Sequence, residues 1–513
     1  MGGELVQREL QARSSAALRR FWKEILLFGA FFGILLYCSP LDITQIGFGD
    51  KGFYYLYGAK YEVYTYPAPF YLTLGWLVTR APWLDGFMMS FFLSALPALG
   101  TAILVHVIVR EKTKNVLAAW VATLVLMTSW VFFIQAVKVE SYCLIAFLTV
   151  LAYYLMTRPK PKNIWAQVAF GLAIASHWFD ALPAWLALSV YRRQWKWILV
   201  APAVGAGIFF GWMYWFSGTT GDSAGVGGIF THTEVLFRSI LWGGNLKDVG
   251  ERFTDVSSVI ITSCWLAAVP AFIYFIKGEA REKVPIFFIC AIPLAILAVG
   301  KYPAAYMHFA VAVPFLAIAA GFGVPYMSSM FLRRVVPVTL IAGLIAMPFV
   351  FGNLDTNPTQ ARKMINYLDD VPDGSLIYCD RIMPDGRTDR ISGALTEFCV
   401  RYHNEETGSN NIPVPPQYVM IGYADSVEIS YDDELRDQGV NLPCHDSQAV
   451  YLWEDDWESN IFLGAWRLKV LNPEKKIYIY RMEDVETWQT GLYEVVEMGE
   501  IDPETGEVIS ESS

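Results

Sequence analysis

Ionisable and hydrogen-bonding residues stand beside long apolar segments in four separate parts of the chain. Carboxylates so placed can take a proton from a hydroxyl group, and lysine or histidine can stabilise a developing negative charge. Charge in hydrocarbon costs about 2.5–3.5 kcal/mol per residue on insertion scales, so such residues are functional candidates. The four sets are Asp50 and Lys51 in GFGDKGF, Lys138 and Glu140 in QAVKVESY, His177 and Asp180 in SHWFD, and Lys301, Tyr302 and His308 in KYPAAYMHF.

The composition indicates which solvent these sets face. The chain has 513 residues, of which 54% are hydrophobic and 17% charged, with a mean hydropathy of +0.35. Soluble globular proteins average about 45–50% apolar and about 25% charged residues. The sequence therefore predicts an integral membrane protein with a soluble portion.

The charge distribution divides the chain near residue 353. The segment from Asn353 to Ser513 holds 32 acidic and 12 basic residues, whereas the rest holds 17 acidic and 27 basic ones. We expect a basic cytoplasmic N-terminus at 1–20 and a transmembrane catalytic domain at 21–352. Strand-like and helix-like segments then alternate over 353–496 and predict an extracytoplasmic α/β domain, followed by an acidic, disordered tail at 497–513.

Hydropathy and loop charge together predict a multi-pass α-helical protein. Each span needs about 20 apolar residues, and loops rich in Lys and Arg stay in the cytoplasm. About 11 spans result, and every even-numbered one is followed by a basic cluster, which puts the N-terminus inside and the acidic tail outside. The candidate spans are 21–39, 86–109, 116–134, 141–157, 164–177, 180–192, 197–216, 255–276, 284–300, 304–325 and 335–352.

This topology places all four polar sets on the outer side. The first set falls in a long outer loop at 40–85, whose proline-broken apolar stretch at 65–84 predicts helices lying at the interface. Only about 29 residues separate Lys162 from Arg192. The fifth and sixth spans, at 164–177 and 180–192, must therefore be short helices with His177 and Asp180 at their outer tip. Any one set alone is consistent with ordinary loop polarity, but their coincidence on one side favours a functional site.

Cysteines and sequons give a weaker indication of the compartment. The seven cysteines show no metal-binding spacing, and at most one disulfide can form among Cys379, Cys399 and Cys444 in the tail. The first apolar run lacks a clear cleavage site and predicts a signal anchor. The absence of Asn-x-Ser/Thr favours a prokaryotic source and hence the plasma membrane. In a eukaryote the expected location is the endoplasmic reticulum.

Several segments resemble the GT-C superfamily of membrane glycosyltransferases, in the branch related to protein O-mannosyltransferases. The likeness covers roughly residues 40–190 in order and spacing, with a weaker echo at 301–323. It rests on GFGD, on YPAPFYLTLGWLVTRAPWLDG, on SWVFFIQAVKVESYCLIAFL and on FGLAIASHWFDALPAW. The resemblance implies a GT-C-like fold, a polyprenyl-phosphate-linked sugar donor, and transfer to a protein or glycan acceptor on the non-cytoplasmic face.

The resemblance also implies roles for individual residues. Asp50 falls on the catalytic acidic residue of the first outer loop and is expected to be the general base, Glu140 falls on the catalytic glutamate of the second, and His177 on the family histidine. The chain departs from the pattern at Lys51, where a further carboxylate is common, and at Tyr66, which replaces a histidine. A divalent metal is therefore neither required nor excluded. The residues expected to bind the donor phosphate or substrate are Lys138, His177, Lys301, Tyr302, His308 and Tyr66.

Two other classes of function stay open. A transporter or flippase of lipid-linked sugars would show inverted repeats and binding residues at mid-membrane on broken helices, and the sequence shows no repeat. A non-catalytic membrane anchor for the acidic domain would leave the polar sets unexplained. The acidity of the tail argues against binding to nucleic acid.

Overall fold

The structure is a computed structural model of the whole chain, and it describes part of it. The described residues are 22–38, 59–60, 68–80, 90–220, 268–299, 306–327, 340–345 and 390–414, with shorter pieces between 334 and 378 and strands between 451 and 479. The chain divides into two compact units. Unit 1 comprises Met1–Arg362 with Asn460–Val470, and unit 2 comprises Lys363–Ser459 with Leu471–Ser513.

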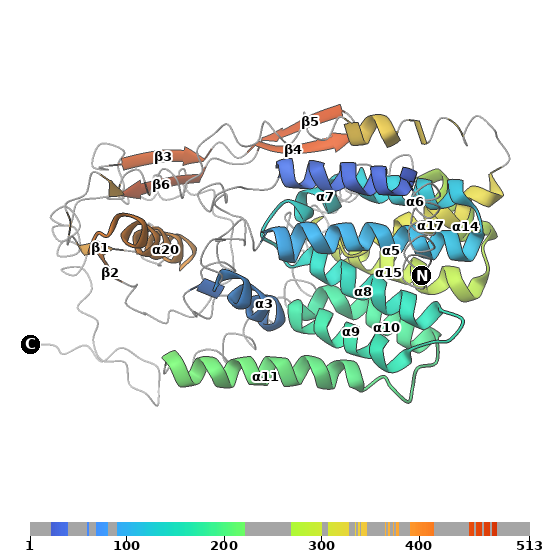
Figure 1. Cartoon of the computed structure of the whole chain (residues 1–513), viewed down its shortest axis with the longest axis horizontal. Coiled ribbons are helices and arrows are strands. Elements are labelled where there is room, and N and C mark those ends of the chain that lie inside the picture. Colours follow the sequence, from blue (N-terminus) through green and yellow to red (C-terminus); the bar gives the residue numbers. More distant parts are fainter. Residues whose placement is uncertain are drawn as a thin grey trace, which may run out of the picture. The chain divides into compact units, whose positions relative to one another are not determined.

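Unit 1 is mostly helical, as the sequence predicts (Figure 1). A helix over 22–38 precedes the labelled elements. These are α3 (Pro69–Thr79), a π-helix (Phe91–Ala95), α5 (Leu96–Thr113), α6 (Val116–Met127), α7 (Trp130–Ala136), α8 (Tyr142–Thr157), α9 (Asn163–Ser176), α10 (Trp178–Tyr191), α11 (Val200–Thr220), α14 (Ala268–Lys277), α15 (Ala280–Val299), α16 (Tyr306–Phe309) and α17 (Val313–Gly323). A short 3₁₀ turn, η5 (Val324–Tyr326), follows α17, and the hairpin strands β4 (Glu458–Leu463) and β5 (Trp466–Leu471) pair with each other.

Unit 2 contains one long described helix and two strand pairs. The helix is α20 (Arg390–Thr407). Strands β1 (Leu376–Tyr378) and β2 (Ile412–Val414) pair in parallel, whereas β3 (Tyr451–Asp455) and β6 (Lys475–Ile479) pair antiparallel. Cys399 on α20 is buried and free, and Cys379 and Cys444 lie outside the described residues. The α/β domain as a whole stays a prediction.

Local sequence determines the turn between α5 and α6. Lys114 ends α5 in the left-handed conformation, with a φ of 53°. Asn115 then caps α6, because its side-chain oxygen accepts the backbone N–H groups of Leu117 at 2.9 Å and Ala118 at 3.3 Å. Asparagine suits an N-cap because its short side chain reaches N–H groups that have no partner within the helix. This turn sends α6 back along α5.

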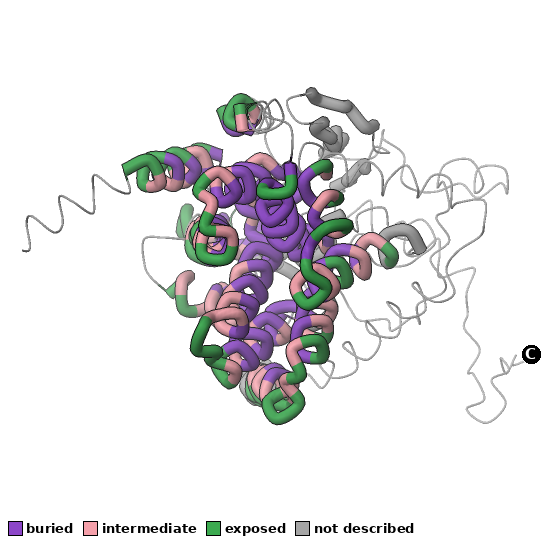
Figure 2. Tube along the Cα trace, turned by 90° about the vertical axis from the view of Figure 1, so that its right-hand side faces the viewer, coloured by how far each residue is buried: buried purple, intermediate pink, exposed green. Residues whose placement is uncertain are grey.

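The helices of unit 1 stack side by side around α8. Figure 1 shows α5, α8, α9 and α11 as neighbours with nearly parallel axes, and the burial colours of Figure 2 run along the middle of this stack. Small residues let the backbones approach closely. A Cβ on Gly171 of α9 would lie 2.6 Å from the Val204 Cβ and 2.8 Å from the Ala201 carbonyl oxygen of α11.

We expect the replacement Gly171→Val to lower the free energy of unfolding by about 1–3 kcal/mol, because an overpacked contact forces backbones apart. Gly207→Val on α11 is the matched control, since nothing lies within 4 Å of a Cβ at that position. The control should change stability by less than about 0.5 kcal/mol. Thermal unfolding of both variants in detergent measures the difference, and equal melting temperatures would contradict close α9–α11 packing.

One described helix is long and apolar enough to cross a membrane. It runs over Phe91–Thr113, and the pair formed by Val116–Met127 and Trp130–Ala136 passes the same criterion only when both helices are taken together. The other apolar helices in the described part of the chain, such as Tyr142–Thr157, are shorter. The count of about 11 spans and their topology stay predictions.

The candidate span at 116–134 consists of two helices, α6 and α7. The chain bends by 65° between α6 and α7. Ser129 has extended backbone angles (φ −71°, ψ 116°), and the Thr128 hydroxyl donates to the Leu124 carbonyl at 2.7 Å, where the helix ends. Hydroxyl side chains can bond to the preceding turn and compete with regular helix geometry. The bend directs α7 and the segment 137–141 toward the start of α8.

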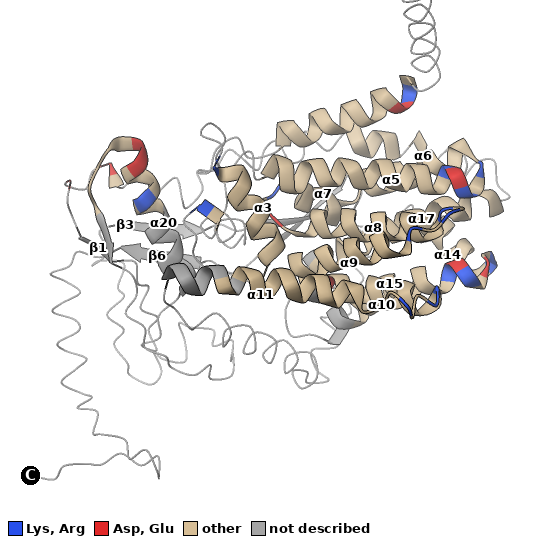
Figure 3. Cartoon of the chain, turned by 60° about the horizontal axis from the view of Figure 1, so that its bottom comes forward, with Lys and Arg blue, Asp and Glu red and all other residues tan. Residues whose placement is uncertain are grey.

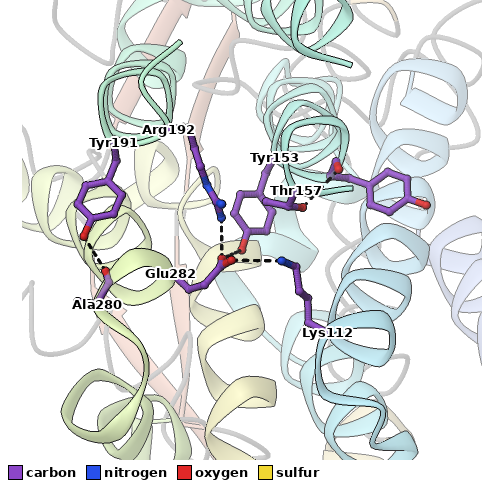
Figure 4. Close-up of polar contacts among 8 residues, drawn as sticks. Lys112, Tyr153, Thr157, Tyr191, Arg192, Ala280 and Glu282 are labelled. Carbon is purple, nitrogen blue, oxygen red and sulfur yellow. Dashed lines mark hydrogen bonds and ion pairs between the residues drawn. The ribbon is translucent and has the colours of Figure 1, made fainter. Parts of the chain in front are cut away.

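A charged cluster joins three chain segments at one end of the helices. In Figure 3 the Lys, Arg, Asp and Glu residues of the described helices of unit 1 gather mainly at the right-hand end. In the close-up of Figure 4, Glu282 accepts hydrogen bonds from Arg192 Nη2 at 2.8 Å, Lys112 Nζ at 3.2 Å and the Tyr153 hydroxyl at 3.0 Å. Lys112, Arg192 and Glu282 come from three of the basic clusters that follow the even-numbered candidate spans. At the same end, Arg110 pairs with Glu24 at 2.9 Å.

The cluster also determines the protonation of Glu282. Burial on its own raises the pKa of a carboxyl group, but the charges of Arg192 and Lys112 outweigh burial. The pKa of Glu282 therefore lies below its ordinary value of 4.5. Glu282 is ionised at neutral pH and holds three helices together by charge.

Candidate functional site

The structure describes about half of the residues predicted for the site. Lys138, Glu140, His177 and His308 lie in described segments, as does Asp180. The remaining predicted residues lie outside the described part of the chain: Asp50, Lys51, Tyr66, Lys301 and Tyr302.

The junction of α9 and α10 places His177 and Asp180 together. His177 is the single residue between the two helices, and its extended backbone (φ −169°, ψ 102°) separates them. Asp180 is the third residue of α10, where a carboxylate is favoured near the positive end of the helix dipole. Because cap and third helical residue face each other, the His177 Nδ1 lies 2.5 Å from Asp180 Oδ2.

A third residue joins this pair from far along the chain. The short helix α16 brings His308 to Asp180, with 2.6 Å between His308 Nδ1 and Asp180 Oδ1. The Nδ1 atoms of His177 and His308 thus each contact one oxygen of the Asp180 carboxylate. The side chain of Asp180 is only 1% exposed, that of His177 8% and that of His308 19%. We call these three residues the His–Asp–His cluster.

Tyr142 connects the His–Asp–His cluster to the segment that contains Glu140. Its buried ring lies edge-on to His308, with 5.6 Å between ring centroids, and 6.2 Å from the ring of His177. Tyr142 is the first residue of α8, two residues after Glu140, which is only 1% exposed. Lys138 lies in the same short segment and is half-buried. Tyr142 therefore links the segment of the Lys138 and Glu140 set to the His–Asp–His cluster.

The π-helix fixes the backbone of Glu140 from the other side. The Ser94 hydroxyl donates to the Glu140 carbonyl at 3.1 Å, and the Glu140 N–H lies 3.3 Å from the same hydroxyl oxygen. Ser90 donates to the Val137 carbonyl at 3.4 Å. Single-turn π-segments inside helices occur often at functional sites. The π-helix here turns both serines toward 137–140.

The phenol of Tyr71 on α3 also lies close to Glu140. Burial raises the pKa of Tyr71 well above its ordinary value of 10.0, the Ser94 side chain lowers it, and the Glu140 charge raises it further. Tyr71 is fully buried and therefore stays a neutral phenol at any physiological pH. The phenol of Tyr71 is thus a neutral polar group near the carboxylate of Glu140.

Sequence reasoning missed several members of this arrangement. The sequence pattern places Asp180 beside His177 without indicating a role for it, and it does not single out Ser94, Tyr71 or Tyr142. The spacing of Tyr142, two residues after Glu140, was a signal that could have found it. Ser94 and Tyr71 stand in apolar helices without a distinguishing pattern.

The arrangement can support acid–base, anion-binding or metal-binding chemistry. The three donor atoms of the His–Asp–His cluster lie within 4.8 Å of one another, which is a spacing that a metal ion can bridge. Comparison of the sequence with protein-family models and with curated proteins gives no match. The function has to be argued from the site itself.

Proposed function

We propose that the chain is a multi-pass membrane glycosyltransferase that moves a sugar from a polyprenyl-phosphate-linked donor to a protein or glycan acceptor on the non-cytoplasmic face. The observation that supports this proposal best is that His177 and His308 meet at Asp180. The ring of Tyr142, two residues after Glu140, lies against both imidazoles, so residues from three polar sets far apart in sequence share one region. Two imidazoles at helix ends, next to a segment that holds the buried carboxylate of Glu140, suit a reaction that needs a base and a phosphate-binding group.

The position of the site within the helices supports the predicted face. Tyr142 begins α8, whereas Tyr153 lies near its other end and contacts Glu282. Asp180 likewise begins α10, and Arg192 follows its end. The polar sets and the basic clusters therefore belong to opposite ends of the same helices. Basic loops mark the cytoplasmic side, so the site belongs on the outer side.

Each side chain has a specific role in the proposed reaction. Glycosyl transfer passes through an oxocarbenium-like transition state, in which the acceptor hydroxyl loses a proton and the donor phosphate gains charge. Asp50 is the proposed general base, and Glu140 orients the sugar or a neighbouring cation. Lys138, His177 and Lys301 hold the departing phosphate, and Tyr302, His308 and Tyr66 complete the binding surface.

A transporter or flippase of lipid-linked sugars is the second candidate. The 65° bend between α6 and α7 favours it, because broken helices carry the binding sites of many secondary transporters. A transporter would move the labelled donor across the membrane without forming a new glycosidic bond.

The deciding experiment compares the wild-type chain with Asp50→Asn in membranes supplied with radiolabelled polyprenyl-phosphate hexoses. We expect the variant to lower transfer of label to acceptor by about 10²–10⁴-fold, the usual contribution of a positioned base. Asp42→Asn changes a carboxylate in the same predicted loop and should leave transfer unchanged. Equal transfer by wild type and Asp50→Asn would remove Asp50 as the base. Label that crosses the membrane but reaches no acceptor would favour the transporter.

A further inference from the structure

We propose that His177, Asp180 and His308 bind one zinc ion. The observation is geometric: two imidazole nitrogens and one carboxylate oxygen lie within 4.8 Å of one another, with His177 and Asp180 buried and His308 partly exposed. The residues come from the α9–α10 junction and from α16, so the site is formed only in the folded chain.

The donor set selects the metal. Two nitrogen ligands and one oxygen ligand are typical of zinc sites with an open coordination position, which hold three protein ligands and a water or substrate. Mg²⁺ and Ca²⁺ prefer oxygen ligands throughout. Fe²⁺ accepts two histidines and a carboxylate as well, but it binds a given nitrogen and oxygen site more weakly than Zn²⁺ in the usual affinity order.

The distances are compatible with a bridging ion after a small adjustment. The His177–Asp180 and His308–Asp180 contacts, at 2.5 Å and 2.6 Å, are shorter than the 2.7–3.2 Å usual for N–H···O hydrogen bonds. In a tetrahedral site with bonds of about 2.0–2.1 Å, neighbouring ligand atoms lie about 3.3 Å apart. Binding therefore requires each imidazole to move away from the carboxylate by less than about 1 Å, which rotation of the side chains can supply.

Surrounding groups hold the ligands in place. The Tyr142 ring contacts both imidazoles and restricts their orientation, and the N-terminal turn of α10 favours the Asp180 carboxylate. His308 is the most exposed ligand and marks the side from which an ion can enter. In known metal sites, residues that contact the ligand side chains fix their orientation in the same way.

A metal-free alternative uses the same atoms. If each Nδ1–H donates to Asp180, the cluster is a hydrogen-bonded clamp that ties α16 to the α9–α10 junction. The clamp has no preference for any ion, whereas the zinc site has a defined stoichiometry and ligand set. Metal content therefore separates the two arrangements.

The site would also extend the proposed function, on which this step rests. Zn²⁺ with two neutral imidazoles and one carboxylate carries a net charge of +1, so its open position can take a phosphate oxygen of the donor. Zinc binding itself does not depend on glycosyl transfer and is measured separately.

The experiment uses the full-length protein in detergent, treated with a chelator, reloaded with Zn²⁺ and freed of excess ion by gel filtration. We expect one zinc per chain by mass spectrometry for the wild type. Asp180→Asn and His308→Gln should bind zinc at least about 100-fold more weakly, because each loses a direct ligand. His106→Gln and His403→Gln are matched controls and should keep one zinc, because they change buried histidines that hydrogen-bond Thr123 and Asp369 instead.

A second measurement keeps the proposal testable if a variant fails to fold. X-ray absorption at the zinc edge of the loaded wild-type protein should show nitrogen and oxygen ligands with the scattering pattern of two imidazoles. A wild type that retains no zinc after gel filtration, or zinc without imidazole ligands, would overturn the site in favour of the clamp. Bound zinc together with transfer that chelation does not reduce would overturn only the catalytic role, and absence of transfer from any donor would count against the proposed function alone.

Discussion

Glu140→Gln is expected to lower sugar transfer by about 10²-fold or more while the protein stays folded. Glutamine keeps the size and shape of glutamate but cannot carry its negative charge. The Glu140 backbone is held by Ser94, and these hydrogen bonds do not involve the carboxylate. The variant therefore removes one charge at the site and leaves the positions of α8 and the π-helix unchanged.

The expected loss follows from where the carboxylate lies. Glu140 is only 1% exposed and lies near the phenol of Tyr71, which burial keeps neutral. Electrostatic interactions are stronger in such surroundings than in water, so a charge that orients a cation or stabilises an oxocarbenium ion has a large effect there. Glutamine has the shape of glutamate and the Ser94 hydrogen bonds stay in place, so the glutamine variant should stay folded at the temperature of the transfer assay.

Measuring kcat/KM for transfer and the melting temperature on the same preparations separates the two effects. Glu24→Gln is the matched control, because Glu24 pairs with Arg110 among the charged residues at the other end of the helices. That control should leave transfer unchanged, because Glu24 lies at the end of the helices opposite the His–Asp–His cluster. Unchanged transfer by Glu140→Gln would contradict a catalytic role for Glu140, and a large fall in its melting temperature would point to a structural one.

The sequence predicted the part of the site that depends on local pattern. The short spans expected at 164–177 and 180–192 correspond to α9 and α10, and His177 is the residue between them. Charged residues are excluded from the apolar faces of such helices, so helix ends collect them, and helix ends can be located from hydropathy alone. The predicted topology likewise placed His177, Glu140 and His308 on the same side of the membrane.

The rest depended on contacts that leave no local pattern. The second partner of Asp180 is His308, 128 residues away, and no periodicity in either segment indicates that pairing. The bend at Ser129 falls inside an apolar run without proline or glycine, so hydropathy predicts one continuous helix there. The π-helix at Phe91–Ala95 shifts hydrogen bonds within an ordinary apolar sequence, and it therefore could not be predicted from composition.

Glu282→Gln is expected to lower the free energy of unfolding by about 2–3 kcal/mol. Removing one partner of a buried ion pair costs about 3–5 kcal/mol, because the other charge stays buried without compensation. Arg192 is 10% exposed and would keep its buried charge, whereas Lys112 is 36% exposed and would be hydrated. The expected loss is therefore smaller than that for a fully buried pair, because water screens the exposed Lys112 charge. Glu24→Gln at the neighbouring Arg110 pair should cost about 1 kcal/mol or less, because Arg110 is 30% exposed.

The same cluster predicts how stability changes with pH. The pKa of Glu282 is lowered in the folded protein, so its contribution is fully present above the ordinary pKa of 4.5 and is lost as the pH falls through the lower folded-state pKa. Other carboxylates titrate in the same range, so the informative quantity is the difference between wild type and Glu282→Gln. That difference should be constant from pH 7 to about pH 5 and should shrink below about pH 4.5.

Thermal unfolding in detergent across this pH range measures the difference, and transfer activity measured below the melting temperature provides the control. The length of α10, about 20 Å, separates Glu282 from the His–Asp–His cluster, so transfer by the folded variant should equal that of the wild type. If Glu282→Gln and Glu24→Gln lose equal stability, the contacts of Glu282 with Tyr153, Lys112 and Arg192 do not stabilise the fold more than the Glu24–Arg110 pair does. A difference that persists undiminished at pH 3 would show that its charge is not what joins the three helices.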